Sequence, residues 1–284
     1  SFREAAQSLA ERVGIEVPQR SPEQVRQEEV RDRLFLINHR AAEFFYRALR
    51  SAGGNDARRY LSGRGIDKVL ARQFYMGYAP PGWDSLTQFL LEQGFVEDEL
   101  IESGLVISGN RGLYDRFRDR IIFPICDHQG RFLAFGGRSL GEGQPKYLNS
   151  PEQILFRKSS VLYGLNWTKE SIRRRDNVVI VEGYTDCVSL WAKGITHTAA
   201  TLGTSLTEQH AQLLRRFSSN VTLAFDGDEA GLKAIVRGMS VLRDAGLKVS
   251  VASLPSGTDP DTFARQQDPE VLERWLETAV PWPE

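Results

Sequence analysis

The second half of the chain alternates short apolar runs with helical segments, and this alternation restricts the possible folds more than any other feature. Buried strands that alternate with helices are typical of a largely parallel sheet covered on both faces. The expected strands lie at residues 178–181, near Thr198, and at 221–225 and 248–254; the expected helices end at Gly194 and cover 207–217 and 229–245. We therefore predict a doubly wound α/β unit.

The first half follows a mixed pattern of helices and strands. A Ser-Pro-Glu-Gln sequence at residue 21 is a helix start, and Gly53 and Gly54 end that helix. Residues 131–138 follow a His-Gln-Gly turn, which predicts the second strand of a hairpin. The long helix should bury Leu34, Ile37, Ala41, Phe44, Phe45 and Leu49. Residues 1–20 predict a separate amphipathic helix, the remnant of an upstream module.

Length and composition limit the class of protein. With 284 residues, 41% of them apolar and 26% charged, the chain should form two packed units of an ordinary soluble protein. It carries no leader and no membrane span, so we expect a cytoplasmic protein. Two cysteines are too few for a disulfide framework or a four-thiolate zinc site. Because the net charge is −1, contact with nucleic acid requires a local concentration of Lys and Arg.

Acidic side chains follow three of the expected strands. The carboxyl ends of parallel strands meet at one edge of a sheet, so these side chains should lie together. Like charges in such a group raise one another's pKa unless a cation lies among them. Oxygen ligands without His or Cys favour Mg²⁺ or Mn²⁺. The acids are Glu182, Asp186, Asp226, Asp228, Asp259 and Asp261.

A cluster of carboxylates of this kind can hold two metal ions about 4 Å apart, an arrangement that suits phosphoryl transfer. Each segment also has a purely structural explanation. Asp226 and Asp228 could belong to a turn that caps a helix, residues 182–186 could be acids favoured by a helix dipole, and Asp259 could simply start a helix. Their joint occurrence after strands of one α/β unit favours a metal site.

These segments resemble known motifs. The Glu-Gly-Tyr-Thr-Asp run at 182–186, the Thr-Leu-Gly-Thr loop at 201–204, Asp-Gly-Asp-Glu-Ala-Gly at 226–231 and Asp-Pro-Asp at 259–261 resemble the Toprim domain shared by primases, topoisomerases and some nucleases. Further runs at 60–65, 77–80, 114–120, 135–138 and 145–152 resemble, in order, the core of bacterial replicative DNA primases. The resemblance covers essentially the whole chain.

The resemblance implies a mixed α+β amino-terminal subdomain followed by a Toprim subdomain with a doubly wound, largely parallel sheet. It divides the chain into a remnant at residues 1–20, a basic, template-binding subdomain at 21–160 and a catalytic subdomain at 161–284. It makes Glu182, Asp226 and Asp228 catalytic and metal-binding, with Asp186, Asp259 and Asp261 as further ligands; Glu182 is either a ligand or the proton acceptor. Two or more Mg²⁺ or Mn²⁺ ions are implied, and zinc only in an upstream module that this sequence lacks.

The resemblance also implies an activity and partners. The activity is synthesis of short RNA primers from ribonucleoside triphosphates on single-stranded DNA, with an RNA–DNA hybrid as product, at the bacterial replication fork. A replicative helicase and single-strand-binding protein would act through modules absent from this sequence, and no membrane is involved. Template and nucleotide residues would include Arg64, Arg138, Lys146, Tyr147, Asn149 and Lys158. Two alternatives stay open: another Toprim enzyme, a topoisomerase or nuclease, or a non-catalytic single-strand-binding module.

The basic residues, taken without the resemblance, also favour binding of nucleic acid. Arg116, Arg118 and Arg120 alternate through an expected strand, which would place them on one face where guanidinium groups suit phosphate. The alternative is a solvated strand face neutralised by neighbouring acids. Tyr147 offers a surface on which a base could stack, although ordinary packing would also explain it.

Overall fold

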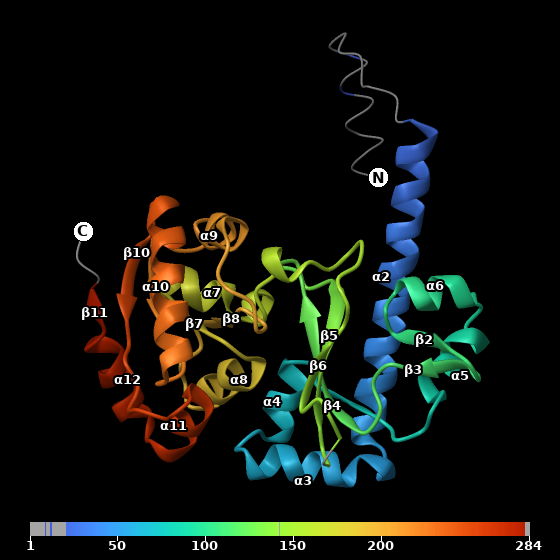
Figure 1. The fold of residues 1–284 in the computed structure, drawn as a ribbon, viewed down its shortest axis with the longest axis horizontal. Helices are drawn as coiled ribbons and strands as arrows, with labels where there is room; N and C mark the ends of the chain where they lie inside the picture. Colours follow the sequence, from blue (N-terminus) through green and yellow to red (C-terminus); the bar gives the residue numbers. More distant parts are fainter. Residues whose placement is uncertain (1–8, 10–11, 13–20, 142, 282–284) are drawn as a thin grey trace.

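A computed structural model describes residues 9, 12, 21–141 and 143–281, so the helix expected over residues 1–20 lies almost entirely outside the described part. The amino-terminal and carboxyl-terminal halves lie side by side, with the long helix α2 (Pro22–Arg50) at one end and the strand β11 (Val280–Pro281) at the other (Figure 1). Within the described residues, no helix has both the length and the apolarity to cross a bilayer.

The amino-terminal half packs α2 against an antiparallel sheet. Ser21 starts α2 with a capping box, and the predicted face is buried apart from Phe44, which is half-buried. The predicted hairpin is confirmed, because β4 (Arg120–Cys126) pairs antiparallel with β5 (Phe132–Ser139). The sheet has the order β1-β4-β5-β6, with β1 at Gly77–Ala79 and β6 at Tyr147–Asn149; β2 (Val106–Gly109) and β3 (Gly112–Asp115) form a separate hairpin. The shorter helices are α3 (Asn55–Gly63), α4 (Lys68–Gln73), α5 (Ser85–Glu92) and α6 (Glu97–Glu102).

The carboxyl-terminal half is the predicted doubly wound sheet. Its order is β11-β10-β9-β7-β8, and β10, β9, β7 and β8 are mutually parallel. The strands are β7 (Val178–Val181), β8 (Thr198–Ala200), β9 (Asn220–Leu223) and β10 (Lys248–Val251). The helices are α7 (Leu165–Arg175), α8 (Tyr184–Ala192), α9 (Glu208–Leu214), α10 (Glu229–Asp244), α11 (Pro260–Gln266) and α12 (Pro269–Glu277). The sequence did not predict the antiparallel edge strand β11.

Strand β7 shows how both faces of this sheet are covered. All four of its side chains are buried, and alternate residues of a strand point to opposite faces. Val178 and Ile180 join a cluster with α7, α9 and α10, whereas Val179 and Val181 join a cluster with α8, α11 and α12. The continuous β-branched run in the sequence therefore reflects burial on both faces.

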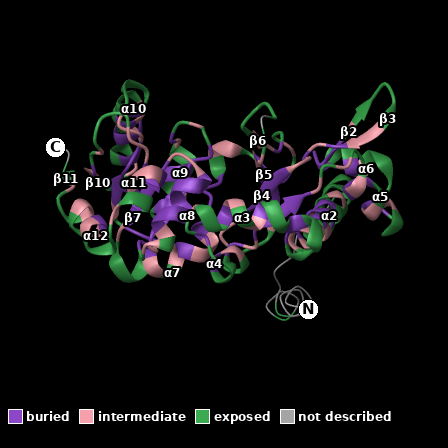
Figure 2. Ribbon diagram, turned by 90° about the horizontal axis from the view of Figure 1, so that it is seen from below, coloured by how far each residue is buried: buried purple, intermediate pink, exposed green. Residues whose placement is uncertain are grey.

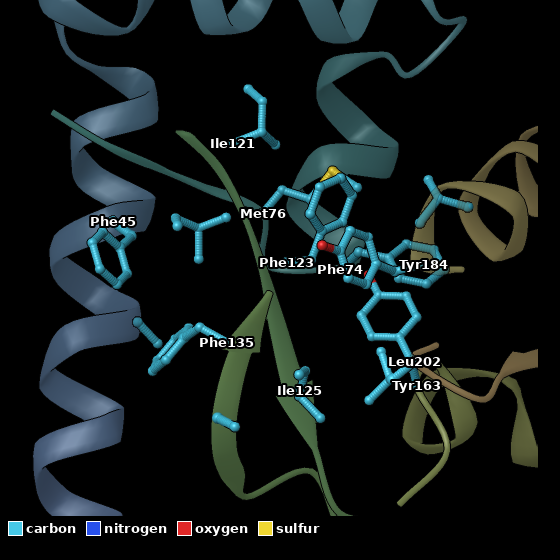
Figure 3. Packing of buried hydrophobic residues seen from close by; sticks show 14 of the residues in the cluster. Phe45, Phe74, Met76, Ile121, Phe123, Ile125, Phe135, Tyr163, Tyr184 and Leu202 are labelled. Carbon is cyan, nitrogen blue, oxygen red and sulfur yellow. The ribbon is translucent and has the colours of Figure 1, made fainter. Parts of the chain in front are cut away.

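The second of these clusters extends into the amino-terminal half. Phe74 lies 4.9 Å from Trp167 and 5.4 Å from Trp191, measured between ring centroids. Phe123 of β4 stacks on Tyr184 of α8 at 4.4 Å. Figure 3 follows this packing from Phe45 on α2 to Tyr184, and Figure 2 shows buried segments running from β4 and β5 into α8 and β7. The two halves thus share one hydrophobic core.

A buried carboxylate fixes α5 to the hairpin. Asp115 is 2% exposed, and its oxygens accept hydrogen bonds from the backbone N–H groups of Leu86 and Thr87 and from Thr87 Oγ1 at 2.7–2.8 Å. Burial raises the pKa of Asp115, and these hydrogen bonds oppose that rise. Asp115 therefore caps a helix that is far from it in sequence.

Asp115→Ala should lower the free energy of unfolding by about 2–4 kcal/mol, because it leaves buried backbone donors without acceptors. Denaturant unfolding monitored by circular dichroism measures the change. Asp84→Ala is the matched control, since Asp84 precedes the same helix but is exposed and makes no capping hydrogen bond. A change of less than about 0.5 kcal/mol is expected there, and equal effects of the two variants would contradict the assignment.

Candidate active site

A cleft of about 460 Å³ lies at the carboxyl ends of the parallel strands, between the two halves. Glu182 follows β7 directly, Asp226 follows β9, and Asp259 follows β10 after a loop. The prediction that acids from separate strands meet at one rim is confirmed, since β10, β9 and β7 are neighbours. The acids that line the cleft are Glu182, Asp186, Asp226, Asp259 and Asp261.

Helix starts hold several of these acids in place. Asp228 caps α10 through the N–H of Gly231 at 2.7 Å, and Asp259 caps α11 through the N–H of Thr262 at 2.6 Å. Asp186 accepts a hydrogen bond from the N–H of Gly183 at 2.9 Å. The structural role considered for each segment is therefore real, and it coexists with the gathering of charge, because each capping bond occupies one oxygen of a carboxylate.

The carboxylates of the cleft disturb one another. Burial raises the pKa of Asp226 to about 6, and the charges of Glu182 and Asp259 add to the rise. Burial also raises the pKa of Glu182, with a further contribution from the charge of Asp228, and raises that of Asp186 to about 8. Glu182 lies beside Asp226, since its Oε1 accepts a hydrogen bond from the Asp226 N–H at 3.3 Å. Among the described residues, the carboxylate of Asp226 therefore has no cationic partner that would offset the cost of its charge.

The donor set fits a hard divalent cation. The carboxylate of Asp226 accepts no hydrogen bond in the described part of the chain, and its neighbours Glu182 and Asp228 also offer oxygen. No three Asp, Glu, His or Cys side chains of the described residues already form a metal-binding group. The ligand set therefore stays a prediction.

Asp261 differs from the other acids. Its Oδ2 pairs with Arg64 Nη1, its Oδ1 accepts a hydrogen bond from Ser189 Oγ at 2.5 Å, and Arg265 contacts both oxygens at 3.3 Å. Its side chain is 8% exposed. Asp261 is therefore neutralised by protein cations.

The amino-terminal half supplies the basic and polar wall of the cleft. Arg64, Lys146, Tyr147 and Asn149 line it. The guanidinium groups of Arg64 and Arg138 both lie over the ring of Tyr60, at 5.1 and 4.6 Å from its centroid. Arg138 also lies 5.6 Å from the centroid of Tyr147. Tyr60 and Arg138 are not among the described residues that line the cleft, but they contact Arg64 and Tyr147, which do.

The prediction that Arg116, Arg118 and Arg120 lie in one strand and share one face is wrong. Only Arg120 lies in a strand, because Asp119 adopts a left-handed φ of 49° that interrupts the extended chain. Arg116 donates to the Asn149 carbonyl at 3.2 Å, Arg118 stacks 4.5 Å from the Trp83 ring, and the buried Arg120 donates to the Pro145 carbonyl at 2.8 Å. Their three environments therefore differ.

Lys158 is not among the described residues that line the cleft. Its carbonyl accepts a hydrogen bond from His210 Nε2 at 2.8 Å. The sequence did not single out Tyr60, Ser189 or Arg265. The spacing of Tyr60 and Arg64 by four residues on a helix is the one local signal that was available; Ser189 and Arg265 reach the site through packing of α8 on α11.

Gly231 is required next to Asp226. A Cβ atom at position 231 would lie 2.1 Å from the Asp226 carbonyl oxygen, which is backbone and cannot move aside. We expect Gly231→Ala to destabilise the fold by about 1–3 kcal/mol and to weaken Mn²⁺ binding, as measured by denaturant unfolding and metal titration. Gly53→Ala is the control, since its Cβ would meet no atom closer than 3.7 Å. An unaffected Gly231→Ala would contradict this packing argument.

Comparison with known proteins agrees with this geometry. Residues 44–169 match the family model for the amino-terminal domain of the DNA primase catalytic core, and residues 179–264 match a Toprim-like model. The chain is 43% identical to a DNA primase of Clostridium acetobutylicum over 99% of its own length and 47% of that protein. A solved DnaG primase catalytic domain bound to single-stranded DNA is 38% identical, with a TM-score of 0.83, covering 89% of this chain and 81% of that one. A structure of the zinc-binding and RNA polymerase domains of the Aquifex aeolicus primase is 34% identical, with a TM-score of 0.83, covering 99% of this chain and 68% of that one.

Proposed function

The chain belongs to the bacterial DNA primase family, and from this premise we propose that it joins ribonucleotides on a single-stranded DNA template, as a nucleotidyltransferase. It spans about half the length of the curated relatives it matches, for example 47% of the Clostridium protein. The activity is therefore proposed for this chain on the strength of its own cleft. The observation that carries the proposal is one cleft lined by carboxylates of the carboxyl-terminal half and by Arg64, Lys146 and Tyr147 of the amino-terminal half.

Glu182, Asp226 and Asp228 would hold Mg²⁺ or Mn²⁺, with Asp186 and Asp259 close by. Bound divalent ions would lower the pKa of an attacking 3′-hydroxyl and neutralise charge on the triphosphate. The raised pKa of Asp226, about 6, means that this carboxylate gains more from a cation than an exposed one would. Glu182 stands either as a ligand or as the proton acceptor.

The basic wall would bind the substrates. Lys146 and Arg64 line the cleft and suit phosphate, and Tyr147 is 40% exposed, so its ring is available for stacking on a base. Asn149 adds a further polar side chain to this wall.

The proposed activity also implies partners and a division of roles between the two halves. A primase bound to single-stranded DNA is among the similar structures, and we propose the same template, with an RNA–DNA hybrid as product. Contacts with a replicative helicase and single-strand-binding protein are proposed through segments outside this sequence. The cation-rich wall supports template binding by residues 21–160, and the acids support catalysis by 161–284. A replication-fork location follows from the proposed activity.

The competing activities make different products. A Toprim topoisomerase would relax supercoiled DNA through a nucleophilic Tyr, a nuclease would shorten DNA, and a binding module would do neither. The test incubates the chain with a short single-stranded template, labelled ribonucleotides and Mg²⁺ or Mn²⁺. Template-dependent labelled RNA is expected. Relaxation or cleavage of DNA without labelled RNA would overturn the proposal.

A further inference from the structure

Every oxygen lone pair of Asp261 has a donor close to it. Oδ1 faces Ser189 Oγ at 2.5 Å and Arg265 Nε at 3.3 Å, and Oδ2 faces Arg64 Nη1 and Arg265 Nη2. A carboxylate offers about four such lone-pair sites, so none is left for a metal ion. Two guanidinium groups would also repel a cation placed beside them.

The neighbouring acids contrast with this arrangement. Asp259, two residues earlier, uses Oδ1 to cap α11 and has no cation as partner in the described part of the chain. Asp226 accepts no hydrogen bond from the described residues, and nearby carboxylates raise its pKa. Asp261 thus has the surroundings of an ion-pair partner, although it belongs to the same Asp-Pro-Asp segment as Asp259.

The cation held by Asp261 comes from the opposite half of the molecule. Arg64 follows the last residue of α3, 197 positions before Asp261, and its side chain is 19% exposed. Figure 1 shows α3 and α11 on the same, lower side of the molecule. Arg64 Nη1 donates to Asp261 Oδ2, and Arg64 Cζ lies 5.1 Å from the centroid of the Tyr60 ring. Because both groups restrict its rotation, the other N–H groups of Arg64 have a fixed direction at the lining of the cleft.

We propose that Asp261 is a positioning residue and binds no metal: it holds Arg64 across the boundary between the halves, so that Arg64 presents its remaining N–H groups to a substrate phosphate in the cleft. The inference rests on the proposed function for the identity of that phosphate. Its source is either the incoming ribonucleoside triphosphate or the template backbone. Ser189 and Arg265 then serve to hold Asp261 itself.

The test compares Asp261→Asn, Arg64→Gln and the double variant with the parent chain. Asparagine keeps the shape of Asp261 but loses the charge that orients Arg64. We expect each single variant to raise either the KM for ribonucleotide or the Kd for single-stranded DNA by about tenfold or more, as loss of a charge-assisted contact does. Which constant changes identifies the source of the phosphate. Because Asp261 acts through Arg64, the double variant should be no worse than Arg64→Gln, within about twofold.

Direct Mn²⁺ binding, followed by electron paramagnetic resonance, separates positioning from metal ligation without any need for activity. Asp261→Asn should bind Mn²⁺ as the parent does, within about twofold, whereas Asp226→Asn should bind it at least about tenfold more weakly. Arg64→Lys, which keeps the charge, should recover part of the loss seen with Arg64→Gln. Weakened Mn²⁺ binding by Asp261→Asn, or multiplicative effects in the double variant, would overturn the proposal.

The two proposals fail in different ways. If the parent makes no RNA, the proposed function fails, but Mn²⁺ affinity and the coupling of Arg64 with Asp261 in thermal unfolding can still be measured. A coupling near zero would overturn the positioning role by itself. If Asp261→Asn does not fold, Arg64→Lys and Arg64→Gln still report whether the direction of Arg64 affects substrate binding.

Discussion

Asp226→Asn should reduce template-directed RNA synthesis by at least about a hundredfold. Mutation of a residue that hydrogen-bonds to a metal ligand commonly lowers metal affinity or activity ten- to a hundredfold. Mutation of the ligand itself should lower them more. The assay is incorporation of labelled ribonucleotides at saturating template with Mg²⁺ or Mn²⁺. Asp244→Asn, at the end of α10, is the matched control and should leave the rate unchanged.

Stability measurements distinguish this result from simple unfolding. Burial and neighbouring carboxylates raise the pKa of Asp226 to about 6, so its charge destabilises the metal-free fold near neutral pH. Removal of that charge should leave the metal-free melting temperature equal to or higher than that of the parent. A variant that folds, retains most of its activity and binds Mn²⁺ normally would disprove the role assigned to Asp226.

The metal-free chain should become less stable as pH rises through about 6. For an acid whose pKa is higher in the folded than in the unfolded state, the folded state binds more protons between the two values, so stability decreases with increasing pH in that window. Asp226, with a pKa of about 6, and Asp186, with a pKa of about 8, both contribute in this direction. The stability from these groups is fully present below about pH 4, and it is lost as pH rises through about 6 for Asp226 and through about 8 for Asp186.

Divalent metal should reverse this loss. At about a hundred times its Kd, Mn²⁺ should add about 2.7 kcal/mol at pH 8 and much less at pH 5, where protons compete for the ligands. Thermal unfolding at several pH values, with and without Mn²⁺, measures both effects. Asp226→Asn should reduce the loss of metal-free stability around pH 6, while the loss that Asp186 causes up to about pH 8 remains. A stabilisation by Mn²⁺ that is equal at pH 5 and pH 8 would contradict the assignment.

The sequence predicted the acidic side of the cleft well, for a topological reason. Parallel strands place their carboxyl ends at one edge, so the order of β10, β9 and β7 brings Asp259, Asp226 and Glu182 together without any knowledge of side-chain packing. The long helix α2 was equally clear, because its capping box and its buried face are both local patterns.

Features that depend on distant partners could not be predicted in the same way. The regular spacing of Arg116, Arg118 and Arg120 suggested a strand, but a single left-handed residue, Asp119, sends the three side chains into different environments. The ion pair of Asp261 with Arg64 could not be predicted, because Arg64 lies in the other half of the chain. The local sequence pattern predicts which element carries a charged residue. The tertiary contacts determine which residue of opposite charge neutralises it.

The hydrophobic core common to both halves also bears on how nucleic acid would move through the cleft. Phe123 and Tyr184 stack directly across the boundary, and Phe74 packs there against two tryptophans. A hinge opening would expose these rings to water, at a cost that aromatic burial makes large. We therefore expect the cleft to keep a fixed width. Under the proposed function, the template would then have to move relative to the protein each time a nucleotide is added.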